Sequence, residues 1–430
     1  APDVHQSLLS YRTGVDQSAP SVSALLIESA PYLEQFIAKA FSIESEVALH
    51  QAAIAKLDPV FAFKSHFVLR KAKRALRQAD QAPSFEVLTI WLDKTLLKHK
   101  IDIADRELAV AQLGCLLMDD PNFSEDAASL VAWCVQAMTS AAGQAAVSGW
   151  VSFKRPEPLD YEALVPIAVD ASDALQRSEG PKSTHRSRDG FALTDERMSA
   201  REVLSEVDYC VFCHKNAGDF CSKGFPVKKS APDLGLKQNP LGETLTGCPL
   251  EEKISEMQFL KRSGYSIAAL AVIMIDNPMC PATGHRICND CMKACIYQKQ
   301  TPVDIPQVET RALTDVLAFD YGVEIYDLLT RWNPLRKRQW LPLPYNNKKV
   351  LVMGMGPAGF TLAHHLLMEG CAVVGMDGLK IEPLPERMVT QPIRDYTQWV
   401  ESLDERLMLG FGGVSEYGIT VRWDKNFLKL

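Results

Sequence analysis

Cysteines are the residues of this chain that are best suited to chemistry. Eight of the eleven lie in one region, and they are Cys210, Cys213, Cys221, Cys248, Cys280, Cys288, Cys291 and Cys295. Three of them follow the pattern C-x2-C-x7-C, and three others follow C-x2-C-x3-C. Thiolates coordinate iron, and short loops that carry three of the four ligands of a 4Fe–4S cluster lower the entropic cost of assembling the site. The spacing therefore predicts two such clusters.

Structural zinc is the alternative use of these cysteines, because two C-x2-C pairs also fit zinc ribbons. Each run, however, contains a third cysteine, and proline follows Cys248 and Cys280, a recurring feature of ferredoxins. We favour iron–sulfur clusters. A zinc-stabilised, non-enzymatic scaffold or adaptor with a helical interaction domain remains the alternative.

A glycine-rich turn follows the cysteine region. Gly354, Gly356 and Gly359 come directly after a strand-like run and precede an uninterrupted helical run, the context of a dinucleotide-binding turn. In such a turn the first glycine permits the bend, the second lets the backbone approach a pyrophosphate, and the third lets helix and strand pack closely. Asp377 ends the next strand-like run and is placed to bind the ribose hydroxyls.

The order of these motifs resembles one family, which includes the small subunit of glutamate synthase and dihydropyrimidine dehydrogenase. The matching segments are Cys210–Cys213, Gly247–Ile254, Thr283–Cys295, Thr301–Ile305 with Glu309, Gly354–Gly359 and Gly412–Ile419. The resemblance covers residues from about 200 to 430, and it leaves residues 1 to about 195 unexplained.

The resemblance implies two interleaved clusters. The ligands that it implies for one cluster are Cys210, Cys213, Cys221 and Cys295. Those that it implies for the other are Cys248, Cys288, Cys291 and, as a fourth ligand, Glu309. Cys280 is additional to the family pattern. Because thiolate is the softer ligand, we favour Cys280 over Glu309 as the eighth ligand, and both remain candidates.

The resemblance also implies that the dinucleotide is FAD. The residues that it assigns to the flavin are Pro357 and Ala358 within the turn, followed by Gly412, Gly413, Tyr417 and Gly418. NAD(P)H would bind to sequence that this chain does not contain. The implied function is the electron-transfer portion of an NAD(P)H-dependent flavin and iron–sulfur oxidoreductase. Electrons would pass between the flavin and the two clusters, to or from a partner protein or a further domain. Because the cofactors carry the chemistry, we predict no catalytic acid or base.

Apolar residues recur at helical spacing along the first 150 residues. The segments that this periodicity predicts as helices are Ala24–Phe41, Glu46–Lys56, Ser65–Gln78, Phe85–His99, Ala104–Met118 and Asp126–Ala142. Ser84 is a predicted N-cap. The basic stretch Arg70–Arg74 fits a solvated helix face, and Cys115 and Cys134 fit packed core positions.

These features predict a multidomain protein. Residues 1–177 form an all-α domain of unknown role, and residues 178–195 form a polar linker. Residues 196–345 form an α-helical, ferredoxin-like domain with two 4Fe–4S clusters. Residues 346–430 form the first part of an α/β, Rossmann-like FAD-binding domain. The chain begins at Ala1 without methionine and ends a short way into this last fold, so we expect it to be part of a longer protein.

The composition and patterning of the sequence limit which partners and which compartment we expect for the protein. A net charge of −7 argues against nucleic acid and anionic membranes as partners. The apolar stretch Ser266–Ile275 is too short to cross a bilayer and predicts a buried helix. Clustered cysteines without a secretory signal favour a reducing cytoplasm.

Overall fold

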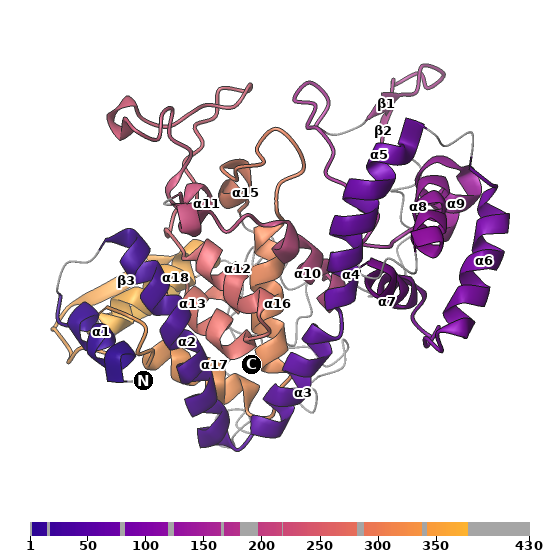
Figure 1. The fold of residues 1–430 in the computed structure, drawn as a ribbon. Helices are drawn as coiled ribbons and strands as arrows, with labels where there is room; N and C mark the ends of the chain where they lie inside the picture. Colours follow the sequence, from indigo (N-terminus) through magenta and orange to yellow (C-terminus); the bar gives the residue numbers. More distant parts are fainter. Residues whose placement is uncertain are drawn as a thin grey trace, which may run out of the picture. The chain divides into compact units, whose positions relative to one another are not determined.

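The structure is a computed structural model (Figure 1). It describes residues 2–14, 18–77, 82–118, 124–164, 167–180, 197–216, 218–281, 288–337 and 342–376. The chain divides into two compact units. We call Ala48–Pro156 with Ser199–Tyr209 the helical unit. We call Ala1–Val47, Glu157–Met198 and the chain from Cys210 onward the cysteine unit. The domain boundaries predicted from the sequence stay predictions.

The helical unit is built from short helices. They are α3 (Glu44–Ala55, which begins in the other unit), α4 (Asp58–Phe63), the π-helix η1 (Lys64–Ala72), α5 (Lys73–Ala75), α6 (Phe85–Lys98), α7 (Arg106–Met118), α8 (Ser124–Thr139), α9 (Ala141–Ala146) and α10 (Ala200–Tyr209). The helices predicted here are confirmed with two differences: Ser65–Gln78, whose last residue lies outside the described ranges, starts as a π-helix, and Asp126–Ala142 is interrupted at Ser140. The predicted cap is confirmed too, since the backbone N–H of Val87 donates to Ser84 Oγ at 3.5 Å. Arg70 and its basic neighbours are exposed, as expected.

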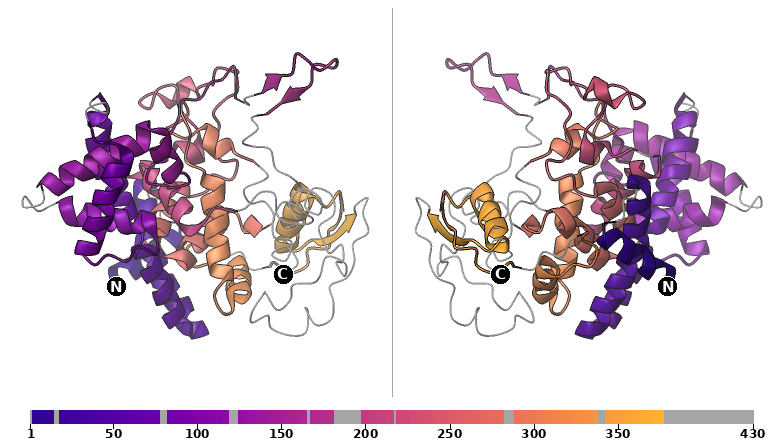
Figure 2. Two further views of the ribbon diagram at one scale, coloured as in Figure 1. Left: turned by 90° about the vertical axis from the view of Figure 1, so that its right-hand side faces the viewer. Right: turned by 90° about the vertical axis from the view of Figure 1, so that its left-hand side faces the viewer.

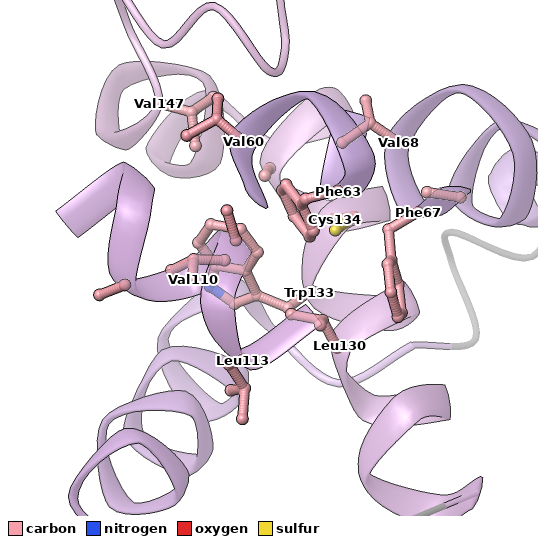
Figure 3. Close-up of a cluster of buried hydrophobic side chains, with 14 of the residues drawn as sticks. Val60, Phe63, Phe67, Val68, Val110, Leu113, Leu130, Trp133, Cys134 and Val147 are labelled. Carbon is pink, nitrogen blue, oxygen red and sulfur yellow. The ribbon is translucent and has the colours of Figure 1, made fainter. Parts of the chain in front are cut away.

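Aromatic and branched side chains fill the core of the helical unit (Figure 3). Trp133 is 2% exposed, and its ring lies 5.7 Å from that of Phe85 and 6.0 Å from that of Phe153, centroid to centroid. Burying such a side chain stabilises the fold by about 1.5–3 kcal/mol. Cys134 is fully buried among these residues, which confirms that it is a packing residue, whereas Cys115 is only half-buried.

A buried carboxylate attaches α10 to the rest of this unit. Glu107, on α7, accepts hydrogen bonds at Oε1 from the backbone N–H and the hydroxyl of Ser152, at 2.8 and 2.7 Å. Its Oε2 accepts from Arg201 of α10 at 3.0 Å, and Arg201 also pairs with Asp105. These bonds satisfy the charge of a side chain that is 4% exposed.

The helices of the cysteine unit surround one apolar helix. They are α1 (Pro2–Arg12), α2 (Ala19–Phe41), η5 (Cys213–Asn216), α11 (Phe220–Lys223), η6 (Pro232–Leu234), α12 (Ile254–Arg262), α13 (Ser266–Asp276), α15 (Asp290–Lys293), α16 (Ile305–Leu317) and α17 (Gly322–Arg331). Helix α13 is the central helix and packs against α2, α12 and α16 (Figure 1). Residues 266–274 of α13 are at most 1% exposed, so the predicted buried helix is confirmed. Within the described ranges, no helix combines the length and the apolar character that crossing a membrane requires.

Buried polar side chains hold both ends of α13. At its start, the backbone N–H of Ala268 donates to Glu34 Oε2 of α2 at 2.9 Å, where a negative charge also favours the helix dipole. At its end, the carbonyl oxygens of Ala271 and Met274 accept from Asn333 and Arg336, both at 2.7 Å. The bonds to Ala268 and Met274 satisfy backbone groups that the ends of a helix leave unpaired.

The predicted fold class is wrong. The described residues contain two sheets of two strands each. Strands β1 (Ala168–Val169) and β2 (Ser178–Glu179) pair antiparallel, so the N-terminal region is not wholly helical. Strands β3 (Lys349–Met353) and β4 (Ala372–Met376) pair parallel and are connected through α18 (Pro357–Met368), which packs beside them (Figure 2).

One parallel strand pair does not make a Rossmann-like domain. Parallel sheets are stable when helices cover both faces, yet Leu351, Met353 and Val374 are 55%, 68% and 63% exposed. Nor does any metal-binding group within the described ranges identify the helices of the cysteine unit as a ferredoxin-like domain. The rest of the predicted FAD domain, residues 377–430, lies outside the described residues.

Candidate metal centre

Four cysteines from three segments of the chain line one small pocket in the cysteine unit. They are Cys210, Cys213, Cys221 and Cys295, and we call them the first cysteine set. Apolar side chains complete much of the wall, among them Ile254, Val303 and Ile305, each at most 3% exposed. These are the four cysteines that the family resemblance assigns to one cluster.

Local backbone geometry positions the first two of these thiols. Phe212, between Cys210 and Cys213, has a φ of 49°, which turns the chain sharply inside the C-x2-C segment. The backbone N–H of Phe212 donates to Cys210 Sγ at 3.4 Å. The ring of Phe212 rests on Phe259 of α12, with centroids 5.6 Å apart. The turn is therefore anchored to a helix of the core.

Two short helices bring the remaining cysteines together. Helix α11 carries Cys221 and packs against α15, which carries Cys291. Cys295 follows α15 by one turn, and its backbone N–H donates to the carbonyl oxygen of Met292 at 3.1 Å. Because Cys221 and Cys291 lie on neighbouring helices, the first cysteine set lies next to Cys291 and the cysteines near it.

Burial raises the pKa of three thiols in the first cysteine set, those of Cys210, Cys213 and Cys221. The pKa of Cys210 rises to about 12 and that of Cys213 to about 11. The charge of Cys295 raises both further, and the hydrogen bond from Phe212 partly offsets the effect at Cys210. A group of thiolates in this position would need a positive partner, and bound iron is one.

A buried amide lines the same pocket without a hydrogen-bond partner. Gln258 of α12 is 0% exposed, and neither Nε2 nor Oε1 of its side chain is bonded. Leaving such a group unsatisfied costs about 1–3 kcal/mol. An amide N–H that could donate to cluster sulfur is therefore present beside the four thiols, which suits a cluster in this pocket.

The other cysteines gather around two carboxyl groups. We call Cys248, Cys288 and Cys291 the second cysteine set. Besides burial, the charges of Cys248 and Cys288 raise the pKa of Cys291. The charges of Glu252 and Glu309 contribute to the raised pKa of every member, and of Cys280 as well.

Glu309 lies at the centre of this second group. Burial raises its pKa to about 7, while Asn277 Nδ2 donates to its Oε1 at 2.9 Å. Burial raises the pKa of Glu252 well above its ordinary value, and the charge of Glu309 adds to this. Cys280 is 2% exposed and also lies beside Tyr326. The charge of Cys280 contributes to the raised pKa of Tyr326. Both candidates for the eighth ligand are thus near the second cysteine set.

Two glycines let the loops of the two sets approach each other. Gly247 has a φ of +75°, and a Cβ at this position would lie 2.7 Å from the carbonyl oxygen of Ser222. Gly224 has a φ of +92° and faces the same junction. The backbone N–H of Cys248 then donates to the carbonyl oxygen of Cys221 at 2.8 Å. The first and second cysteine sets are therefore connected through their backbones.

Among the residues that the structure describes, no group of three or more His, Cys, Asp or Glu side chains is arranged to hold a metal ion. Zinc and iron–sulfur clusters therefore both stay predictions.

The glycine turn has the local geometry that its spacing predicts. Gly354 has a φ of +90°, and nothing lies within 4 Å of a Cβ added at Gly356. A Cβ at Gly359 would clash with the carbonyl oxygen of Gly354. Pro357 and Ala358 begin α18. Asp377 and the predicted flavin residues Gly412, Gly413, Tyr417 and Gly418 lie outside the described residues.

Sequence reasoning missed three polar residues of the site: Glu252, Gln258 and Asn277. Glu252 lies in the segment that resembles the family, four residues after Cys248, and this proximity could have indicated it. Gln258 and Asn277 belong to helical segments, α12 and the end of α13, whose composition gives no such signal. Only packing brings them to the cysteines.

Comparison with known proteins gives two relatives, and no family model matches the chain. Over 152 residues, or 35% of this chain, it is 54% identical to the uncharacterized protein RP006 of Rickettsia prowazekii (strain Madrid E). Over 280 residues, or 60% of this chain, it is 26% identical to the uncharacterized protein RP005 of the same organism. The matches span 21% of the length of the first relative and 87% of the second. Neither name states an activity, and the resemblance to the glutamate synthase family stays a prediction.

Proposed function

We propose that the cysteine unit holds two 4Fe–4S clusters and transfers electrons. The first cysteine set ligates one cluster, and the second cysteine set with Glu309 ligates the other. The observation that carries this proposal is the pocket lined by Cys210, Cys213, Cys221 and Cys295. These residues come from distant parts of the sequence, and none of them is in a disulfide, so a packing accident is a poor explanation for four thiols in one pocket.

The assignment of Glu309 as the eighth ligand rests on its neighbours. Its charge contributes to the raised pKa of Cys248, Cys288 and Cys291, so Glu309, like Glu252, lies within electrostatic reach of the whole second cysteine set. Cys280 lies beside Glu309, Glu252 and Tyr326. The softness of thiolate as a ligand favoured Cys280, but the position of Glu309 near the second cysteine set favours the Glu309 carboxylate.

Clusters of this kind supply one-electron transfer, at a potential set by charge, hydrogen bonds to sulfur and exposure to solvent. The side chains of this protein set those conditions. Ile254, Val303 and Ile305 keep water from the first pocket, and Gln258 offers a hydrogen bond to it. Both influences determine how readily the site accepts an electron.

The wider role that we propose is the electron-transfer portion of an NAD(P)H-dependent oxidoreductase. FAD would bind at the Gly354–Gly359 turn, and the partner would be another protein or a further domain, in a reducing compartment such as the cytoplasm. The three glycines support nucleotide binding, because the turn leaves open space at Gly356 and directs the start of α18 toward it.

A matched pair of glycine variants tests the nucleotide part. Gly356→Ala adds a methyl group where nothing lies within 4 Å, so the fold should persist while room for a pyrophosphate is lost. Gly359→Ala introduces a clash with the backbone and should lose both local structure and nucleotide. If Gly356→Ala binds FAD as well as the unmodified chain does in fluorescence titrations, this turn is not the flavin site.

Electron paramagnetic resonance tests the cluster part. Full-length protein purified without oxygen should be silent as isolated and should give the signal of two reduced 4Fe–4S clusters after treatment with dithionite. Cys213→Ala should remove one of the two signals, because Cys213 belongs to one set only. A colourless protein that carries zinc and gives no signal would instead support the non-enzymatic scaffold.

A further inference from the structure

A second pocket, of about 500 Å³, lies in the cysteine unit where the start of α2 meets α12 and the segment around α11. Apolar side chains form much of its wall, among them Pro20, Phe220 and Leu236. Its lining is separate from that of the pocket of the first cysteine set, with no residue in common. The proposed electron transfer does not use this space.

Three acidic or hydroxyl side chains in this wall have oxygen atoms without a partner. Glu256 is 3% exposed and Ser23 is 5% exposed, and Glu256 Oε2 and Ser23 Oγ make no hydrogen bond. Asp219 is half-buried, and its Oδ1 is also unbonded. Burying a carboxylate without a partner is costly, so native proteins seldom retain one unless a ligand satisfies it.

The charges around the pocket favour a cation. Glu256 and Asp219 lie close enough for the charge of one to act on the other. Lys223 and Lys229 also line the pocket, but both are exposed, so water screens their charges, and Lys229 already donates to the carbonyl oxygen of Asn216. Glu256 is therefore the buried charge of the wall, whereas the lysine charges are exposed.

We propose that this pocket binds a small organic amine. Its ammonium group would donate to Glu256, Asp219 and Ser23, matching three donors to three acceptors, and its apolar body would lie against Phe220 and Leu236. This proposal does not depend on the clusters.

Benzylamine is a suitable probe because it carries an ammonium group and an apolar ring, and benzyl alcohol is its neutral counterpart. Calorimetric titration of the full chain should detect benzylamine binding that is at least about tenfold tighter than binding of benzyl alcohol, the ratio expected for a hydrogen-bonded charge. Equal affinities, or no binding of benzylamine at millimolar concentration, would overturn the proposal.

Variants then locate the binding site. Glu256→Gln should weaken benzylamine binding by about tenfold or more, since it removes the most buried charge. Glu243→Gln is the matched control, because Glu243 is an exposed carboxylate outside the pocket, and binding should not change. If Glu256→Gln does not fold, Asp219→Asn and Ser23→Ala serve in its place, and each should weaken binding. Unchanged affinity in the variants that fold would contradict the proposal.

Discussion

Individual residues in and beside the cysteine loops have different structural roles. Phe212 bends the chain between two thiols, and Gly247 lets the loop of Cys248 reach that of Cys221. Gln258 brings an unpaired amide to the first pocket. Each of these residues acts through geometry that a different side chain would not reproduce.

Loss of one thiol should remove one cluster. Cys295→Ala takes away a member of the first cysteine set, and iron content should fall from about eight to about four atoms per chain. Cys115→Ala is the control, because Cys115 is a half-buried residue of α7 in the other unit, and iron content should not change. Full iron content in Cys295→Ala would remove Cys295 from the ligands.

Because ligands within a short loop are local in sequence, spacing predicted the runs Cys210–Cys221 and Cys288–Cys295, but the family resemblance, not spacing, placed Cys295 with the first run. Spacing did not predict Glu252, Gln258 or Asn277, which reach the site only after α12, α13 and α16 have packed. The choice between Cys280 and Glu309 shows the same limit. Ligand chemistry can be read from residue types, whereas proximity depends on the fold.

Among the elements, α10 is held to the rest of the helical unit by several polar contacts, and the pair of Arg201 with the buried Glu107 is one of them. Arg201→Ala should destabilise this unit by about 2 kcal/mol, because it deprives the buried Glu107 of a charged hydrogen bond. Arg331→Ala, which removes an exposed pair with Asp327, should cost only about 0.3–0.5 kcal/mol. Denaturant unfolding followed by tryptophan fluorescence measures both, and equal losses would contradict this role of Glu107.

The helix α18 should lose stability in acid. Burial, with the nearby charge of Arg336, lowers the pKa of both His364 and His365 in the folded protein. The unfolded chain therefore binds protons more readily, and the free energy of unfolding should decrease as pH falls from about 6.5 through the lowered pKa.

Hydrogen exchange of α18 amides between pH 5 and 7, corrected for intrinsic rates, measures this effect. His364→Gln should flatten the dependence, whereas His5→Gln, at an exposed position of α1, should not. A dependence that persists in full in His364→Gln would exclude His364 as a source of the acid sensitivity.

The strand–turn–helix–strand order around the glycine turn was predictable because glycine, β-branched and helical patterns are local. The sheet was not. A Rossmann-like domain needs further strands and helices on both faces, and β3 and β4 leave apolar side chains exposed. A motif of this kind therefore predicts a turn more reliably than it predicts the domain around it.

Across the whole molecule, distant segments build the cysteine unit. Glu34 of α2 caps the start of α13, more than two hundred residues later in the sequence. Helical periodicity predicted that α2 has an apolar face, but it does not predict which helix packs against that face. Helix α2 therefore supports the central helix α13 of the cysteine unit, a contact that the sequence alone did not indicate.

Metal content is the most direct test of the central proposal. Protein purified without oxygen should contain about eight iron atoms and about eight acid-labile sulfides per chain, as two 4Fe–4S clusters require, with negligible zinc. That result would support iron–sulfur electron transfer. Stoichiometric zinc with no iron would contradict it and would leave the cysteine loops as structural supports.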